Sequence, residues 1–259
     1  MSTKLEKILV GHIKQANAWW QLFAPGEKVL VGISGGKDSL ALLELLQSFD
    51  LRIESVHLQL SEKEPDSYHN FCRERSHFHI HKTNIGEEAF ASDANKKNPC
   101  FICMRRRRQA IVEFANSRAI KTIVYGHHRD DVIETLFLNQ LYSREISTML
   151  PNQPLLQGEF HIVRPLYTIP QKLLISYARE KEIPYVENDC PAIKKSRRME
   201  IRRLLDDLEK SNPKIDIRDN LFHSLKKINL PFIPKFPDYK IIEIPGTNVR
   251  EKKFEGPKI

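Results

Sequence analysis

Residues 28–39, KVLVGISGGKDS, run from an apolar strand into a glycine-serine turn and then into a helix. Residues 29–33 have the β-branched, apolar composition of a strand buried on both faces, and leucines recur at helical spacing over residues 40–46. The turn therefore lies at a helix N-terminus, where unpaired backbone N–H groups and the helix dipole attract an anion. Gly35 and Gly36 let the backbone approach oxygen atoms without a Cβ in the way. This stretch is a predicted phosphate-binding loop.

The spacing excludes two common nucleotide-binding loops. The P-loop of kinases and GTPases needs a glycine five positions before its Gly-Lys pair, but that position is Val31 here, and Asp38 follows the lysine. The dinucleotide fingerprint G-x-G-x-x-G is missing as well. The sequence SGGKDS after a buried strand resembles the PP-loop of the N-type ATP pyrophosphatases, which split ATP between the α and β phosphates. The alternative is a strand-turn-helix unit with chance glycines.

Length, composition and charge are those of a globular protein with an anionic partner. The 259 residues are enough for one large α/β domain or one domain with an appendage, and 41% are hydrophobic and 29% charged. Residues 1–21 mix lysines with apolar residues, which indicates an amphipathic helix and not a signal peptide. We therefore expect no membrane association and a cytoplasmic location. The net charge of +8 favours a polyanionic partner.

Strand-like and helical runs alternate along the chain. This alternation predicts an α/β fold with a mainly parallel, open sheet and helices on both faces. After the first strand, we expect strands at 53–60, 78–81, 122–125 and 161–163, and helices at 39–48, 66–76, 101–119, 131–142 and 170–182.

The chain divides into three expected parts. These are an N-terminal helix over residues 1–24, a PP-loop domain over 25–229 and a proline-rich tail over 230–259. The five prolines of the last part do not fit inside regular helices, so we expect an extended segment there.

A second motif, NPCFICMRRRR, covers residues 98–108. Asn98 is a good N-cap and Pro99 a good first helical residue, so a helix is expected to begin here. Cys100 and Cys103 then lie three residues apart on one helix face. The helix N-terminus and the four arginines favour the thiolate, which is the form that binds metal or attacks electrophiles.

Three interpretations compete for the two cysteines, and a metal site is the best supported. A thioredoxin-like redox pair conflicts with the phosphate loop, and a structural disulfide is unexpected without a secretion signal. Cys72 and Cys190 are the remaining cysteines and form no second C-x-x-C, so a closed zinc site lacks its usual spacing. Two cysteines with a distant third would leave one iron of an iron-sulfur cluster not bound by protein. Cys72, beside Phe71 in an apparent helix, is expected to be a packed thiol.

The order of the motifs resembles that of the tRNA 2-thiocytidine synthetase (TtcA) family over residues 25–225. The order is SGGKDS, C-x-x-C-x-R-x-R from Cys100, GHHRDD at 126–131, RPL at 164–166 and the late cysteine Cys190. The resemblance implies an ATP-dependent enzyme that replaces the C2 oxygen of an anticodon-loop cytidine by sulfur, with a 4Fe-4S cluster held by Cys100, Cys103 and Cys190. The family pattern around the late cysteine differs here, so Cys72 is the alternative third ligand.

The resemblance also assigns a site for ATP and Mg²⁺. Asp38 would lie near Mg²⁺, His57 would bracket adenine through its backbone, and Gly126 would begin a second nucleotide-binding segment at the carboxyl end of a strand. Asp130 or Asp131 would bind Mg²⁺ or the α-phosphate. Asp131 and Glu134 also fit the N-cap and N3 positions of the next helix. The pyrophosphate portion of ATP is assigned to Ser34, Gly35, Gly36, Lys37, Asp38 and Ser39. The catalytic residues are expected to be Cys100, Cys103, Asp38 and Asp131.

The implied chemistry and the basic segments suggest how substrates bind. A pyrimidine C2 oxygen leaves poorly, so the enzyme would adenylate it, release pyrophosphate and let sulfur displace AMP. The resemblance further implies a sulfur donor such as a cysteine desulfurase, and a homodimer. Phosphate contacts with tRNA are expected from two basic groups, for which the alternative is a solvated helix face. These groups are Arg105, Arg106, Arg107 and Arg108, and Lys194, Lys195, Arg197, Arg198, Arg202 and Arg203.

Two other functions compete with thiolation. The segment H-H-x-D-D-x-x-E-T at 127–135 also resembles tRNA lysidine synthetases, which need ATP but no cluster, and the cysteines argue against that function. A zinc-stabilised, non-catalytic nucleic-acid binder would leave the ATP loop unexplained.

Overall fold

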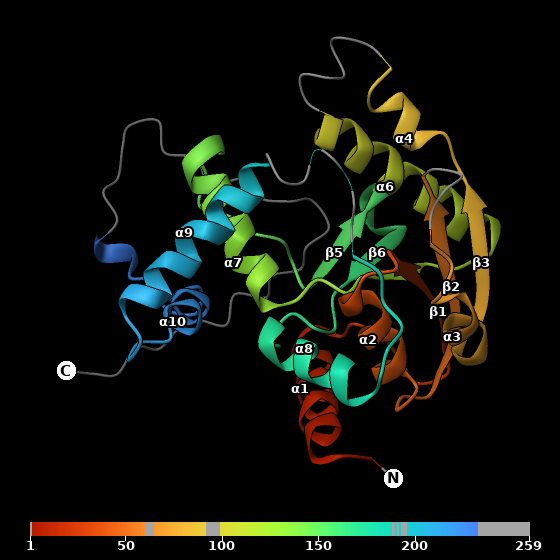
Figure 1. Ribbon diagram of the computed structural model, residues 1–259, viewed down its shortest axis with the longest axis horizontal. Helices are drawn as coiled ribbons and strands as arrows, with labels where there is room; N and C mark the ends of the chain where they lie inside the picture. Colours follow the sequence, from red (N-terminus) through yellow and green to blue (C-terminus); the bar gives the residue numbers. More distant parts are fainter. Residues whose placement is uncertain are drawn as a thin grey trace.

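The computed structural model describes residues 2–60, 65–91, 99–187, 190, 192 and 196–232 (Figure 1). In this part of the chain, no helix combines the length and apolar character needed to cross a lipid bilayer. The strands are β1 (Glu27–Ile33), β2 (Leu51–Gln59), β3 (His77–Lys82), β4 (Thr122–Val124), β5 (Asn152–Leu155) and β6 (Phe160–Val163). The helices are α1 (Lys4–Trp20), α2 (Lys37–Leu46), α3 (His69–Arg75), α4 (Ile85–Glu88), α6 (Pro99–Ser117), α7 (Arg129–Leu138), α8 (Gln171–Glu180), α9 (Arg197–Ser211) and α10 (Ile217–Ser224). Single turns are the π-helical η1 (Asn139–Ser143) and the 3-10 turns η2 (Leu156–Gly158) and η4 (Leu230–Phe232).

The six strands form one open sheet in the order β3-β2-β1-β4-β6-β5. All neighbouring strands are parallel except β5, which runs antiparallel to β6. The chain moves from β1 outward to β3 on one side and from β4 outward on the other. The strand order therefore reverses between β1 and β4, which is where open α/β sheets bind ligands.

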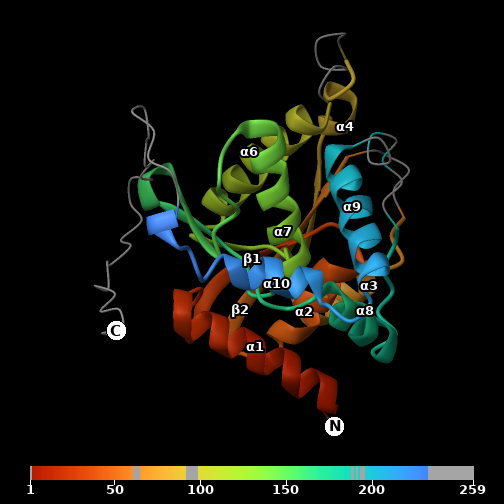
Figure 2. The same cartoon turned by 90° about the vertical axis from the view of Figure 1, so that its left-hand side faces the viewer.

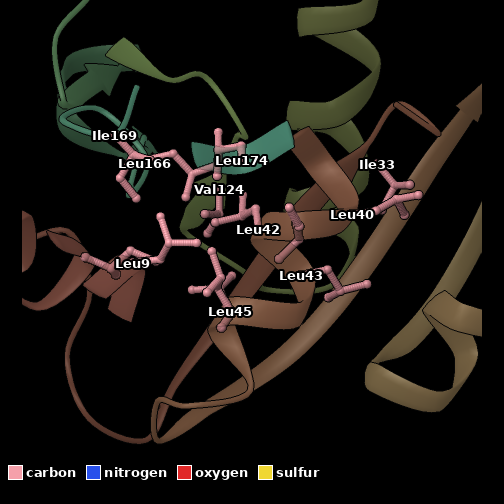
Figure 3. Packing of buried hydrophobic residues seen from close by; sticks show 14 of the residues in the cluster. Leu9, Ile33, Leu40, Leu42, Leu43, Leu45, Val124, Leu166, Ile169 and Leu174 are labelled. Atoms are coloured by element: carbon pink, nitrogen blue, oxygen red, sulfur yellow. The ribbon is translucent and has the colours of Figure 1, made fainter. Parts of the chain in front are cut away.

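Strand β1 is buried on both faces, as its apolar sequence predicts. Val29, Val31 and Ile33 pack with α1, α2 and α8, whereas Leu30 packs with α6 on the opposite face. Figure 3 shows how the leucines of α2 interlock with Leu9 of α1 and Leu174 of α8. Burial of each such side chain contributes about 2 kcal/mol. The predicted α/β sheet with helices on both faces is thus confirmed.

A third apolar cluster joins α7 to the two C-terminal helices. Val132 and Ile133 of α7 contact Ile201 and Leu205 of α9 and Phe222 of α10. Figures 1 and 2 show these three helices packed together at one side of the sheet. Because α7 begins at the carboxyl edge of β4, this packing places the start of α9 near the same edge.

The sequence did not predict strand β5 or helices α9 and α10. Residues 152–155 are polar and contain Pro154, which an edge strand tolerates because its N–H is not needed for pairing. The sequence of α9 indicated only a basic segment. In the structure this segment is a helix that Ser196 caps by accepting a hydrogen bond from the Met199 N–H. The prediction of an extended tail falls mainly on residues 233–259, outside the described residues.

A buried ion-pair cluster ties β1, β2, β3 and α6 together. Glu54, only 5% exposed, accepts hydrogen bonds from Lys28 (2.8 Å), Arg118 (2.9 Å) and, through Nε2, His79 (2.9 Å). Burial opposes ionisation, but these donors outweigh it and lower the pKa of Glu54 from 4.5 to about 2. His77 completes a trio with metal-ligand atoms within 4.8 Å of one another. The two cations already neutralise the carboxylate, so the cluster stabilises the fold and does not attract a metal.

The low pKa of Glu54 makes the free energy of unfolding depend on pH. A depressed carboxylate pKa stabilises the fold above the unfolded value of 4.5, and this stabilisation is lost as pH falls toward 2. Glu54→Gln should lower the free energy of unfolding at pH 7 by about 3 kcal/mol and flatten its decline between these pH values, as measured by urea denaturation. Glu159→Gln, which breaks an exposed pair with Lys121, should change the free energy by less than about 1 kcal/mol. A decline as steep in Glu54→Gln as in the parent would contradict this assignment.

Candidate active site

The PP-loop, residues 34–39, connects β1 to α2 at the point where the strand order reverses. The Ser39 hydroxyl accepts a hydrogen bond from the Ser34 N–H (3.2 Å) and donates one to the Gly36 carbonyl (2.9 Å). The two serine hydroxyls lie 3.1 Å apart. These bonds hold the loop in place and orient the backbone N–H groups at its tip.

Gly35 occupies a conformation and a space that other residues do not fit. Its φ is +77°, and an added Cβ would lie 2.8 Å from the Tyr68 ring. Its carbonyl accepts a hydrogen bond from the Val186 N–H (2.9 Å), which fastens the loop to the segment after α8. Among the described residues, no side chain caps α2 at Gly36, so the helix N-terminus is open to an anion beside Lys37.

The loop between β4 and α7 packs directly against the first turn of α2. A Cβ on Gly126 would lie 3.0 Å from the backbone carbonyl atoms of Asp38 and 3.1 Å from Cα of Ser39. Since these atoms belong to the backbone, any other residue at this position would require the loop or α2 to shift by a few tenths of an ångström. The close approach places Nε2 of His128 3.7 Å from Asp38 Oδ2 and 3.4 Å from Asp131 Oδ2. Two carboxylates thus meet over the PP-loop with one imidazole between them.

The electrostatics of this group favour ionised carboxylates. Burial tends to raise the pKa of Asp38, but the hydrogen bond and charge of His128 and the charge of Lys37 lower it below its usual value. The pKa of Asp131 is lowered in the same way, with burial outweighed mainly by His128. Burial lowers the pKa of His127 to about 4, so this imidazole is neutral. Asp38 Oδ1 is buried without a hydrogen-bond partner among the described residues, as expected of a ligand for a hard cation such as Mg²⁺.

The three acidic residues of α7 have different roles. Asp131 accepts a hydrogen bond from the His128 N–H (3.0 Å), so it stands at N3 and the predicted N-cap position for Asp131 is wrong by three residues. Asp130 accepts from the Gln171 N–H (2.9 Å) and thereby caps α8. Glu134 is buried and pairs with α9, as described below. Asp131 is therefore the acid of α7 that faces Asp38.

Two further predicted residues lie at the same edge of the sheet. His57 of β2 pairs with Ile33, the last residue of β1, and its Nδ1 lies 3.0 Å from the Ile33 carbonyl oxygen. The adenine contact of His57 stays a prediction. Arg164 of the RPL motif is buried and donates hydrogen bonds to the Leu150 carbonyl and the Gln153 side chain. It thereby fixes the segment that leads into β5. Its burial lowers the pKa of Arg164 to about 10.

None of the four cysteines forms a disulfide, and Cys190 lies close enough to Cys100 and Cys103 for its charge to act on both. Cys100 and Cys103 lie in the first turns of α6, which begins at Pro99 as predicted, while the predicted cap Asn98 lies outside the described residues. Burial raises the pKa of the Cys100 and Cys103 thiols, and the charge of Cys190 raises both further. The prediction that the helix N-terminus and the arginines favour the thiolate is therefore wrong for these two residues, because burial outweighs them. Cys72 is fully buried in the core, where burial raises its pKa to about 12. Cys72 is therefore excluded as the third ligand.

The charge of Arg107 reaches both the cysteines and the segment before α7. It offsets part of the rise that burial causes in the pKa of Cys103 and in that of Tyr125. The Tyr125 ring covers Gly32 of β1, where a Cβ would lie 2.6 Å away, and Tyr125 directly precedes Gly126.

The predicted RNA-binding residues divide into an exposed group and a group tied to the site. Arg105, Arg106 and Arg108 are exposed on α6, where Arg106 pairs with Glu88 (3.2 Å). Arg197 lies at the start of α9 and stacks on an aromatic ring of η1. Lys194 and Lys195 lie outside the described residues.

Arg198 and Arg202 interact with acids of α7, which sequence reasoning missed. Arg198 donates to Asp131 (3.2 Å) and to the Thr135 hydroxyl (3.2 Å), and Arg202 donates to Glu134 (2.7 Å). Burial raises the pKa of Glu134, and Arg202 offsets part of that rise. Glu134 could have indicated these pairs from the sequence, because an acid on the packed face of a helix requires a cation nearby.

Comparisons with known proteins agree with this geometry. The PP-loop domain family matches residues 5–208. A tRNA-cytidine(32) 2-sulfurtransferase of Polynucleobacter asymbioticus is 33% identical over 235 residues, which cover 87% of this chain and 77% of that protein. A second, from Francisella tularensis subsp. novicida, is 29% identical over 236 residues, covering 87% and 92%.

Solved structures share the fold. The U34-tRNA thiolase NcsA of Methanococcus maripaludis, determined with its 4Fe-4S cluster, matches with a TM-score of 0.67 at 21% identity, covering 86% of this chain and 80% of that one. An NH3-dependent NAD synthetase of Campylobacter jejuni matches with a TM-score of 0.51 at 13% identity, covering 90% and 99%. The fold and its loops define a PP-loop ATP pyrophosphatase. Within this class, the chain belongs to the tRNA 2-thiocytidine synthetase (TtcA) family.

The close approach at Gly126 predicts a specific loss of ATP binding. Gly126→Ala should push the β4–α7 loop away from α2 and raise the Kd for a non-hydrolysable ATP analogue at least tenfold, as measured by calorimetry. Gly11→Ala, at an exposed α1 position with no atom within 4 Å of the new Cβ, should leave the Kd unchanged. Unaltered ATP affinity in a folded Gly126→Ala protein would show that the packing does not shape the site.

Proposed function

We propose that this protein is an ATP-dependent tRNA thiolase that replaces the C2 oxygen of an anticodon-loop cytidine by sulfur with the help of a 4Fe-4S cluster. Two observations carry the proposal: Cys190 lies close enough to Cys100 and Cys103 for its charge to raise the pKa of both, and Asp38 and Asp131 meet over the PP-loop. The names of the curated relatives, which act on cytidine 32 of tRNA, support the choice of base and position.

The nucleotide loops supply the groups that activation by ATP requires. The open N-terminus of α2 and Lys37 would bind the departing pyrophosphate, and Asp38 with Asp131 would hold Mg²⁺. The C2 oxygen attacks the α-phosphorus, an oxygen–phosphorus bond forms, and pyrophosphate leaves. A sulfur nucleophile then adds to C2, and the C2–O bond breaks as AMP carries the oxygen away. Catalysis is mainly electrostatic, because these groups are in place before charge develops.

The three grouped cysteines fit a cluster with one iron left open. Cys100, Cys103 and Cys190 would be its ligands. Cys190 is distant from the other two in sequence, so the ligand set would form only when the chain folds. When bound, the cluster supplies a sulfur nucleophile at the iron that the protein does not ligate. Burial raises the pKa of Cys103, and the Arg107 guanidinium offsets part of that rise, so ligation to iron would have to displace the thiol proton.

The substrates and partners follow from the same reaction. The exposed arginines of α6 lie beside the cysteine pair, so contacts with tRNA phosphates would bring the anticodon loop to the sulfur source. A cysteine desulfurase or similar donor would restore the sulfur, and a homodimer in the cytoplasm remains part of the proposal.

The cysteine assignment is tested by the metal content and the nucleosides of matched variants. After anaerobic purification, the parent protein should be brown and contain iron and acid-labile sulfide, and it should form 2-thiocytidine in tRNA by mass analysis. Cys100→Ser should lose the cluster and the thiolation but keep its affinity for ATP, whereas Cys72→Ala should keep all three.

Other results would identify the competing functions. Colourless protein with stoichiometric zinc would favour the nucleic-acid binder, and metal-free protein that joins lysine to cytidine would favour the ligase. Thiolation that persists in Cys100→Ser would end the cluster proposal.

Asp38 of α2 and Asp130 of α7 allow a matched test of the Mg²⁺ site. Asp38→Asn should slow tRNA-dependent pyrophosphate release by about 100-fold or more, because it removes a carboxylate with a free oxygen over the PP-loop. Asp130→Asn should retain most of the release rate, since its carboxylate caps α8 instead. A larger loss of pyrophosphate release in Asp130→Asn than in Asp38→Asn would show that the cation binds near Asp130 and not near Asp38.

A further inference from the structure

Tyr142 presents an aromatic ring to solvent in a fixed orientation. It lies in the π-helical turn η1 after α7 and is 42% exposed. Its hydroxyl donates to Glu200 (3.0 Å), which raises the Tyr142 pKa, and the Arg197 guanidinium carbon lies 4.5 Å from the ring centre. Both partners belong to the first turn of α9. The ring is thus held by two polar contacts and buries little apolar surface, so the fold does not explain its position.

The ring is within reach of the nucleotide site. Arg197 directly precedes Arg198, whose guanidinium contacts Asp131. Tyr142 follows Asp131 by eleven residues along α7 and η1, a rise of about 16 Å at 1.5 Å per residue. A few nucleotides of single strand span such a distance, at about 3.4 Å per stacked nucleotide. A π-helical turn in an α-helix often marks a functional position.

The surroundings of Tyr142 combine apolar surface with positive charge. Leu141 and Ile146 are exposed, and Arg144 lies between them at φ +57° with its side chain in solvent. The acids nearby are Glu145, which is exposed, and Glu200, which is occupied by the tyrosine hydroxyl. A flat ring beside guanidinium groups is the combination that binds an unpaired nucleotide, with the base stacked and the phosphate held by arginine.

We propose that Tyr142 and Arg197 form a stacking site for an unpaired nucleotide that flanks the target base in the RNA loop. This inference rests on the proposed function, because it assumes that an RNA loop enters the site. It adds a contact that the motifs do not contain. A protein partner or a second copy of the chain is the competing occupant. The guanidinium groups and the proximity to Asp131 favour RNA.

The chain offers a matched control for the aromatic ring. Trp19 of α1 is 49% exposed, and the Lys226 ammonium lies 5.4 Å from its ring centre. It is therefore also an exposed aromatic residue with a cation, but its cation follows α10 and neither residue belongs to η1 or α9. Loss of this ring should not affect RNA bound at the proposed site.

Fluorescence anisotropy with an anticodon stem-loop RNA tests the stacking site. Tyr142→Ala should raise the Kd for the RNA roughly 5- to 100-fold, because stacking of a base on an aromatic ring is worth about 1–3 kcal/mol. Tyr142→Phe should bind within about threefold of the parent, since it keeps the ring, and Trp19→Ala should match the parent. The affinity for ATP should be the same in all four proteins, which shows that each is folded.

Removal of a base from the RNA distinguishes stacking from a general loss of affinity. Abasic sites introduced one at a time beside the target cytidine should identify a position that weakens binding to the parent but not to Tyr142→Ala. Equal losses in both proteins at every position, unchanged affinity of Tyr142→Ala, or a change in its oligomeric mass would overturn the proposal. If one abasic position weakens binding only when Tyr142 is present, but the protein forms no 2-thiocytidine, the stacking site is supported and the proposed reaction is contradicted.

Discussion

The close approach of the β4–α7 loop to the first turn of α2 is the constraint on which the site depends. It exists because Gly126 has no Cβ where the backbone of Asp38 passes. This contact brings together the carboxylates of Asp38, which follows β1, and Asp131, which follows β4, and it places His128 between them. The folded chain must hold like charges close together at one edge of the sheet, and the rest of the site supplies the compensating cations.

Compensation comes largely from α9. Arg198 and Arg202 neutralise Asp131 and the buried Glu134, while Ile201 and Leu205 on the same helix pack against α7. Helix α9 thus supplies both charge compensation for the acids of α7 and apolar packing against the same helix.

Much of the fold and part of the site could be predicted from the sequence, because the patterns that indicate them involve residues close together in the chain. The apolar strand before SGGKDS, the alternation of strands and helices, and Pro99 before C-x-x-C each depend on neighbouring residues, and the structure agrees with them. The exclusion of Cys72 and the pairing of Arg198 with Asp131 depend on tertiary packing, which no short pattern contains. Strand β5 was missed because a polar edge strand lacks the apolar run by which buried strands are recognised.

The central claim is that ATP makes a nucleobase oxygen replaceable by sulfur. Transfer of a labelled oxygen tests it most directly, with reconstituted protein, ATP, a sulfide source and tRNA that carries ¹⁸O at C2 of the target cytidine. The account predicts one ¹⁸O in AMP for each 2-thiocytidine formed, detected by mass spectrometry. Label that appears in water or pyrophosphate, or thiolation with unlabelled AMP, would contradict it.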